Sequence, residues 1–465
     1  MSRVLCVFAL LCPTLAQAAG LNGAELSLLW SLPFAGLLLS IALFPIFAPA
    51  FWHHHFGKIA LGWALAFLLP CALWLSPADA GNVVVHAMVD EYLPFIVLLF
   101  ALYTISGGIL ITGNLHGSPA LNTGILALGA ACASIMGTTG AAMLLIRPLL
   151  RANDNRRHNV HVVVFFIFLV GNIGGGLTPI GDPPLFLGFL KGVSFSWTFQ
   201  AMLLPVLTAC SLLLLAFYLL DSYYYRKEGV LPRDPTPDNH RLGVQGGFNF
   251  LLLAGVVGAV LMSGMWKPGL ELNILGVKVG IQNLLRDGML LGLAGASLAF
   301  TSTRIRDGNE FNWDPIAEVG KLFGAIFITM APAIAILRAG PDGALAQLVG
   351  LVSRADGSPI DLMYFWMTGS LSSFLDNAPT YLVFFNLASG DPAQMMTQYS
   401  STLLAISAGA VFMGANSYIG NAPNFMIKAI AEHRGVAMPG FFGYMAWAWV
   451  WLFPLCVLLS VLFFL

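Results

Sequence analysis

The sequence predicts an all-α membrane protein in which about eleven transmembrane helices, two re-entrant hairpins and two broken helices form an inverted repeat. The first observation is composition: of 465 residues, 58% are hydrophobic and only 9% are charged, whereas soluble domains carry about 25% charged residues. The lipid bilayer is therefore the expected surroundings. The net charge of −1 gives no basic surface for nucleic acid, which excludes a nucleic-acid partner.

The second observation is where the charged residues stand. Acidic and basic side chains are absent from residues 26–57, 92–146, 192–220 and 435–465, and each stretch is long enough to cross a bilayer. Two acidic residues break this pattern. Asp182 is the only charged residue from 160 to 190, and Asp376 is the only one from 362 to 390. Membrane topology does not explain these two carboxylates.

The first residues have the pattern of a secretory signal, because Arg3 precedes a short apolar run and Ala16-Gln17-Ala18 resembles a cleavage site. We expect a signal peptide at 1–19, a first half of the repeat at 20–225, a cytoplasmic linker at 226–247 and a second half at 248–465. An uncleaved first helix is the alternative.

Windows of about 20 apolar residues predict the spans. Two of them, 160–190 and 400–430, are interrupted and are expected to be broken helices. The basic loops all fall on the cytoplasmic side only if the glycine-rich segments 121–150 and 361–388 return to the side they entered, so both are expected to be re-entrant hairpins. The other predicted spans are 26–48, 58–76, 90–112, 197–222, 248–266, 286–303, 318–338 and 441–465.

An internal repeat is the third observation. A shift of 239 residues places Gly-Thr-Thr-Gly-Ala at 137–141 on Asp-Asn-Ala-Pro-Thr at 376–380. The same shift places Ile-Gly-Asp-Pro-Pro at 180–184 on Ile-Gly-Asn-Ala-Pro at 419–423 without a gap. The paired segments have opposite predicted orientations, which is the signature of an inverted-topology repeat.

Both breaks, residues 171–184 and 414–424, are rich in glycine, proline and asparagine, which favour a non-helical backbone. Lipid cannot satisfy the freed amides and carbonyls, so such a stretch must face protein or a watery cavity. There its carbonyls can bind a cation or a polar substrate. The alternative is a pair of proline kinks whose polar groups are satisfied.

Oxygen-bearing side chains gather at the two hairpin tips. Hard cations such as Na⁺ prefer oxygen ligands, and a carboxylate in a partly dry site also binds protons. Asp182 and Asp376 are therefore the leading candidates for binding Na⁺ or H⁺, although each could instead cap a half-helix. Arg147, in the second arm of the first hairpin, could attract an anion but is expected to extend toward the interface. The tip ligands are Thr138, Thr139, Asp376, Asn377 and Thr380.

The segments Thr178-Pro179-Ile180-Gly181-Asp182 and Asp376-Asn377-Ala378-Pro379-Thr380 resemble the ion transporter superfamily, which contains NhaD-type sodium:proton antiporters, arsenite permeases, and citrate and dicarboxylate carriers. The resemblance implies an inverted-repeat scaffold, usually dimeric, with an elevator-like movement. It departs from the antiporter pattern at Pro183-Pro184-Leu185, and from the dicarboxylate pattern at both hairpin tips. Residues that the resemblance implies line the site are Thr138, Thr178, Asp182, Asp376, Asn377, Thr380, Asn416 and Asn421.

These observations predict a secondary active transporter of the bacterial inner membrane that exchanges Na⁺ for H⁺ and needs no cofactor beyond the transported ions. The resemblance implies that it is a homodimer. The alternative is Na⁺- or H⁺-coupled transport of citrate or another small carboxylate. A third class, a membrane-embedded enzyme or sensor, has no visible catalytic motif such as HExxH or GxSxG in its favour.

Overall fold

The computed structural model describes residues 21–113, 115–229, 243–354 and 356–465. The predicted signal peptide lies outside the described residues, as do residues 230–242 of the predicted linker. The described chain is almost entirely helical and adds two small two-stranded sheets. This confirms the predicted all-α fold.

The chain forms two compact units, each built from segments that are distant in sequence. Unit 1 comprises the described residues within 1–96, 267–284 and 314–351, and unit 2 comprises those within 97–266, 285–313 and 352–465. The predicted division into halves around 226–247 concerns the repeat rather than these units and stays a prediction.

Unit 1 packs apolar helices around aromatic side chains. Its long helix α14 lies against α3 and α2, and Phe95 stacks on Phe323 of α14 with ring centroids 4.6 Å apart. The elements of unit 1 are η1 (Leu28–Ser31), α2 (Leu32–Phe47), α3 (Pro49–Pro70), the π-helical turn η2 (Cys71–Leu75), α4 (Pro77–His86), the π-helical turn η3 (Ala87–Tyr92), the first residues of α5 (Leu93–Ser106), the antiparallel strands β3 (Glu271–Ile274) and β4 (Val277–Gly280), α14 (Asp314–Arg338), η5 (Gly340–Asp342) and most of α15 (Ala346–Val352).

Unit 2 is built around α8, whose residues from His161 to Leu169 are all buried. A helix that is hydrophobic on every side has no face for water and becomes a core helix. The elements of unit 2 are the rest of α5, β1 (Leu110–Thr112) paired with β2 (Gly243–Gln245), α6 (Pro119–Met136), α7 (Thr138–Ala152), α8 (Val160–Leu169), η4 (Ile173–Leu177), α9 (Pro183–Leu190), α10 (Phe195–Glu228), α11 (Phe248–Met265), most of α12 (Ile281–Phe300), α13 (Thr303–Gly308), α16 (Asp361–Ser372), α17 (Asn377–Ala388), α18 (Pro392–Met396), α19 (Ser400–Met413), η6 (Gly414–Asn416), α20 (Ala422–His433) and α21 (Phe441–Phe464).

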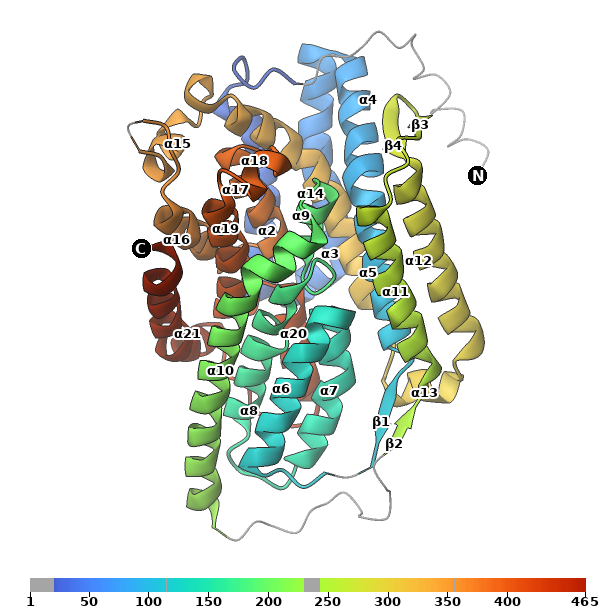
Figure 1. Cartoon of the computed structure of the whole chain (residues 1–465), viewed down its shortest axis with the longest axis vertical. Helices are drawn as coiled ribbons and strands as arrows, with labels where there is room; N and C mark the ends of the chain where they lie inside the picture. Colours follow the sequence, from blue (N-terminus) through green and yellow to red (C-terminus); the bar gives the residue numbers. More distant parts are fainter. Residues whose placement is uncertain (1–20, 114, 230–242, 355) are drawn as a thin grey trace. The chain divides into compact units, whose positions relative to one another are not determined.

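Both hairpins and both broken helices are present in unit 2. The first hairpin is α6–α7, and it turns at Gly137, whose φ of +79° favours glycine. The second hairpin is α16–α17. The first broken helix runs from α8 to α9 and the second from α19 to α20, each through one short 3-10 turn. Figure 1 shows α6 and α7 in the lower part of unit 2 and α17, α18 and α19 in its upper part.

Nine helices of the described chain are long and apolar enough to cross a membrane, against about eleven predicted. The predicted span 400–430 does not count because the break divides it into α19 and α20. Most of the predicted span 286–303 lies in α12, which is not among the nine because polar residues occupy its first two turns. The first arm of the first hairpin, α6, counts in addition.

Candidate functional site

Four helices begin at one place in unit 2, where each hairpin tip meets the break of its own repeat. The amide of Thr138, the first residue of α7, donates to the carbonyl of Gly181 at 2.9 Å. The amide of Asn377, the first residue of α17, donates to the carbonyl of Gly420 at 3.1 Å. Since α9 begins two residues after Gly181 and α20 two residues after Gly420, these bonds join α7 to α9 and α17 to α20 at their N-termini. Hydrogen bonds from Asn377 and Asn421 to Asp182 bring the two pairs together.

These two bonds correspond to each other under the 239-residue shift. The hydrogen bonds of nearby hydroxyl groups correspond in the same way. Thr178 donates to the carbonyl of Ser134, and Ser417 donates to the carbonyl of Ser373. The hydroxyl of Ser134 donates to the carbonyl of Gly174, and that of Ser373 to the carbonyl of Met413. The repeat predicted from the sequence therefore extends to individual hydrogen bonds.

Glycine is needed in both breaks because the backbone folds closely on itself. A Cβ at Gly181 would lie 2.1 Å from the carbonyl oxygen of Gly175, and one at Gly420 would lie 2.5 Å from that of Gly414. Such distances exclude any side chain unless the backbone moves.

Asp182 lies at the centre of the convergence, where it is 2% exposed. Its Oδ1 accepts from Thr138 Oγ1 at 3.2 Å and from Asn421 Nδ2 at 3.1 Å. Its Oδ2 accepts from Asn377 Nδ2 at 2.7 Å. One carboxylate thus receives donors from both hairpins and from the opposite break, and all three donors are neutral.

A chain of buried asparagines joins the two breaks around this carboxylate. Asn421 Nδ2 also contacts the carbonyl of Gly171 and Asn172 Oδ1, both at 3.1 Å. Asn172 Nδ2 donates to Asn424 Oδ1 at 2.7 Å, and Asn424 Nδ2 donates to the carbonyls of Gly414 and Ser417. These amides satisfy carbonyls that the breaks free from helical bonding.

Asn172 and Asn424 were not among the residues predicted from the sequence to line the site. The structure shows that both are fully buried there. The signal that could have identified them is an amide side chain inside a glycine- and proline-rich interruption of an apolar span. Ser134 and Ser373 were also missed, because serine is common in and at the ends of apolar helices and carries no distinctive pattern.

The other predicted residues take different positions. Asp376 is half-buried and caps α17, since its Oδ1 accepts from the amide of Ala378 at 3.1 Å. Thr380 donates to the carbonyl of Asp376, and Asn416 Nδ2 donates to Ser373 Oγ at 2.9 Å. Thr139 is half-buried in the first turn of α7. Asp182 thus has direct hydrogen bonds to three of the predicted residues, whereas Thr178, Thr380 and Asn416 bond to the surrounding frame.

The site contains an unpaired acceptor beside the carboxylate. Asn377 is fully buried, and its Oδ1 has no hydrogen-bond partner among the described residues. A buried amide oxygen without a donor is costly unless a cation or water satisfies it. Because Nδ2 of the same amide bonds Asp182, this oxygen belongs to the same group of side chains as the carboxylate.

A second buried polar cluster lies where α6, α8 and α10 meet. Asp221 accepts from Arg156 at 2.7 Å, from His161 at 2.8 Å and from Asn122 at 2.9 Å, and its side chain has no exposed surface. Arg156 also contacts Glu228 at 3.3 Å. This cluster fixes the first hairpin and α8 against α10.

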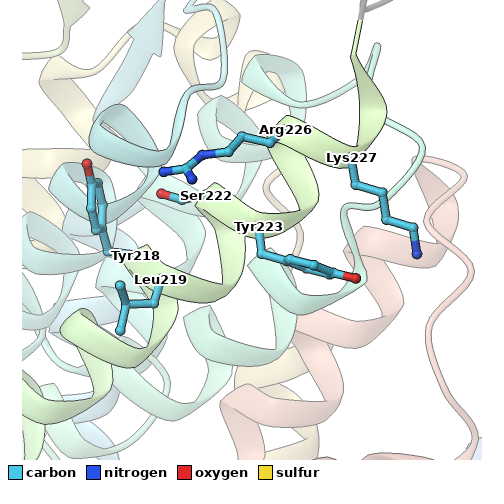
Figure 2. Close-up of a pocket in the computed structure, with 6 residues that line it drawn as sticks. All are labelled: Tyr218, Leu219, Ser222, Tyr223, Arg226 and Lys227. Carbon is cyan, nitrogen blue, oxygen red and sulfur yellow. The ribbon is translucent and has the colours of Figure 1, made fainter.

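A shallow hollow on the last turns of α10 is lined by residues of that helix alone (Figure 2). Lys227 lies over the ring of Tyr223 at 5.9 Å. Exposed tyrosines beside basic residues are typical of the membrane–water interface, so this hollow marks a helix end rather than a substrate site. Its lining residues are Tyr218, Leu219, Ser222, Tyr223, Arg226 and Lys227.

Broken helices and helical hairpins that meet at buried polar groups are typical of a multi-pass membrane transporter. The chain belongs to the family described as "Putative citrate transport", which it matches over residues 23–464. It is similar to the uncharacterized transporter Mb2703 of Mycobacterium bovis, with 24% identity over 326 residues, or 69% of this chain and 71% of the relative. The uncharacterized transporter Rv2684 of Mycobacterium tuberculosis matches with the same identity and coverage.

Proposed function

We propose that the protein is a Na⁺/H⁺ antiporter in which Asp182 binds the two ions alternately. The observation that carries the proposal is the Asp182 carboxylate itself: it is buried, its three side-chain partners are neutral, and the unpaired oxygen of Asn377 lies beside it. A buried carboxylate without a cationic partner needs a positive charge from elsewhere. Na⁺ and H⁺ both supply one.

Competition for the carboxylate couples the two ions. When Asp182 binds Na⁺, the Asn377 oxygen and the hydroxyl of Thr138 are within the same group of side chains and can complete an oxygen shell. When Asp182 is protonated, it has less negative charge for Na⁺. One ion must leave before the other binds, which is the condition for exchange.

Asp376 supplies a second negative charge close enough to Asp182 to interact with it electrostatically. We assign Asp376 an auxiliary role in attracting the cation, because its carboxylate also caps α17. All site residues belong to unit 2, so an elevator-type displacement of this unit would carry the site as one body. We further propose a homodimer in the bacterial inner membrane that carries out transport and no chemical reaction.

The test uses everted membrane vesicles from a host that lacks its own Na⁺/H⁺ antiporters, with a fluorescent reporter of the pH gradient. Added NaCl is expected to dissipate the gradient, whereas an equal concentration of KCl is not. Asp182→Asn should abolish the response, and Asp376→Asn should weaken it. Asp307→Asn, which removes an exposed carboxylate on α13, is the matched control and should respond as the wild type. A full Na⁺ response in Asp182→Asn would refute the assignment.

Coupled transport of citrate or another carboxylate is the second candidate, and one observation favours it. The N-termini of α7, α9, α17 and α20 converge, and the positive ends of helix dipoles favour anions. The family description points the same way. Under this alternative, Na⁺ at Asp182 and Asp376 would neutralise the acidic side chains and allow an anion to bind.

Uptake of radiolabelled citrate into proteoliposomes separates the two functions. Citrate accumulation driven by an inward Na⁺ or H⁺ gradient, without Na⁺-driven proton flux in the absence of citrate, would establish the carboxylate transporter. Na⁺-driven proton flux without any citrate uptake would establish the antiporter.

A further inference from the structure

Three arginines gather at the ends of two helices that begin at the central site. Arg147 and Arg151 lie in the last turns of α7, and Arg434 caps the C-terminus of α20. The two helices pack against each other. Since α7 begins at Thr138 and a helix rises about 1.5 Å per residue, the cluster lies about 15–20 Å from the start of both helices. It is a place separate from Asp182.

The prediction that Arg147 extends toward the interface is wrong. Its side chain is buried, with 5% of its surface exposed. Its Nη2 contacts Glu310 Oε2 at 3.2 Å, and Arg434 Nη2 contacts Glu310 Oε1 at 2.8 Å. Arg151 donates to the carbonyl of Ile111 at 2.8 Å and is close enough to the other two arginines to be repelled by both. Arg147 and Arg434 thus share the Glu310 carboxylate, and Arg151 adds a third positive charge beside them.

Several guanidinium nitrogens in this cluster are buried without an acceptor. Nε and Nη1 of Arg147 and Nε of Arg151 have no hydrogen-bond partner among the described residues. A buried guanidinium with unpaired donors is costly, and its planar fork fits the two oxygens of a carboxylate or phosphate. The unpaired donors therefore point to an oxyanion.

The cluster is open to solvent on one side. The side chains of Glu310 and Arg434 are 45% and 39% exposed, so an anion can reach the buried Arg147 from there. Glu310 itself adopts a left-handed backbone with φ of 49°, which is uncommon for a residue other than glycine, asparagine or aspartate. Such a conformation is retained where a side chain is needed in one position. Here it brings a carboxylate between two arginines.

The positions of the second repeat that correspond to Arg147 and Arg151 are not arginines. The 239-residue shift places Arg147 on Asn386 and Arg151 on Gly390. The arginines therefore do not belong to the symmetric frame of the fold, and a purely structural requirement of the hairpin does not account for them.

We propose that Arg147, Arg151 and Arg434 form a binding site for a small oxyanion with two or more negative charges, in the chemical class of di- and tricarboxylates and phosphate groups. The anion replaces or joins the Glu310 carboxylate and takes up the unpaired donors of Arg147. Its source is either a free anion from the adjoining solution or the phosphate of an anionic lipid. The site does not depend on which ion the central site transports.

The test measures binding to the purified full-length protein by isothermal titration calorimetry, with citrate and phosphate as probes and chloride at equal ionic strength as the reference. The wild type is expected to bind a probe more tightly than chloride. Arg147→Gln and Arg434→Gln should weaken this binding about tenfold or more, because each removes charge-assisted hydrogen bonds. Arg434 is exposed, so its variant should fold even if the Arg147 variant does not.

Glu310→Gln distinguishes a binding site from a structural ion pair. It removes the internal competitor, so the affinity for the probe should rise severalfold although two ion pairs are lost. Arg304→Gln, at an exposed arginine of α13, is the matched control. Binding that persists in Asp182→Asn and is lost in Arg434→Gln belongs to the arginine cluster and not to the central site.

Native mass spectrometry identifies the source of the anion. Retained phosphatidylglycerol that is lost in Arg434→Gln indicates a lipid phosphate, and its displacement by citrate indicates that both sources share the site. The proposal is refuted if citrate and phosphate bind no better than chloride and no lipid is lost in the variant. It is also refuted if binding is the same in Arg434→Gln as in the wild type.

Discussion

Substitution of Asn377 by alanine isolates one hydrogen bond of the central site. Asn377 Nδ2 is the side-chain donor to Asp182 Oδ2, at 2.7 Å, and Asn377 Oδ1 is the unpaired oxygen beside the carboxylate. Alanine removes both atoms. It keeps the amide of residue 377, which donates to the carbonyl of Gly420, so the hairpin tip should stay attached to the break.

The size of the effect follows from the charge on Asp182. A hydrogen bond to a charged group contributes about 1.5–3 kcal/mol, and about 1.4 kcal/mol corresponds to a factor of ten. If Asn377 orients the carboxylate for Na⁺, its loss should raise the Na⁺ concentration for half-maximal exchange about tenfold to 100-fold. Loss of the amide oxygen as a ligand acts in the same direction.

The assay is Na⁺-dependent dissipation of the pH gradient in everted vesicles, measured over a range of NaCl concentrations. Asn386→Ala is the matched control, because Asn386 is a buried asparagine of the same helix that donates to the carbonyl of Leu382. An unchanged half-maximal Na⁺ concentration in Asn377→Ala, together with an inactive Asp182→Asn, would refute the reasoning that Asn377 helps Asp182 bind Na⁺.

Three further predictions concern the second break, the Asp221 cluster and the arginine cluster. Gly420→Ala places a Cβ 2.5 Å from the Gly414 oxygen and 2.6 Å from the Ser372 oxygen, so it should destabilise the protein by about 1–3 kcal/mol. The thermal midpoint, measured by size-exclusion chromatography after heating, should fall accordingly. Gly124→Ala, which meets open space on α6, should not lower stability. Asp221→Asn leaves Arg156 and His161 without their shared carboxylate and should cost about 3–5 kcal/mol; a thermal midpoint equal to that of Asp307→Asn would contradict this. Burial alone would raise the pKa of Glu310, but Arg147 and Arg434 hold it below its ordinary value of 4.5. Its ion pairs should therefore stabilise the fold fully above this value and be lost as the pH falls through the lower, folded-state pKa. The difference in thermal midpoint between wild type and Glu310→Gln should shrink from pH 7 to pH 4, and a constant difference would exclude this linkage.

The hairpins and breaks could be predicted because glycine and proline act locally. Gly137 favours the turn of the first hairpin, and the glycines and prolines at 171–184 exclude a continuous helix whatever surrounds them. The position of Asp182 could be predicted for a similar reason, since a lone carboxylate in an apolar span requires buried partners. The hydroxyl and amide groups of Thr138 and Asn377 at the hairpin tips were predicted from local chemistry, whereas Asn421 was implied by the resemblance to the ion transporter superfamily.

The arginine cluster could not be predicted because its partner is distant in sequence. Arg147 and Glu310 are 163 residues apart, and Glu310 belongs to a short loop after α13 without a repeat equivalent to guide its placement. A buried arginine near a hairpin mouth is indistinguishable, in sequence, from one that extends to the interface. The position of Glu310 depends on a left-handed backbone that its residue type does not favour.

The two repeats have equivalent backbones but place their acidic side chains at different positions. The two breaks and two hairpin tips offer four equivalent N-terminal positions, and the shift pairs Asp182 with Asn421 and Asp376 with Gly137. Each repeat thus contributes one carboxylate, but from a different element: the first from its break, the second from its hairpin tip. Because Asn421 donates to Asp182 across the pseudo-symmetry, the asparagine serves as a partner in the place where a second aspartate would repel the first. In Asn421→Asp, the new carboxylate and Asp182 should share a proton, and Na⁺ exchange should stop. Normal exchange in that variant would contradict the view that only one buried carboxylate can be ionised at this position.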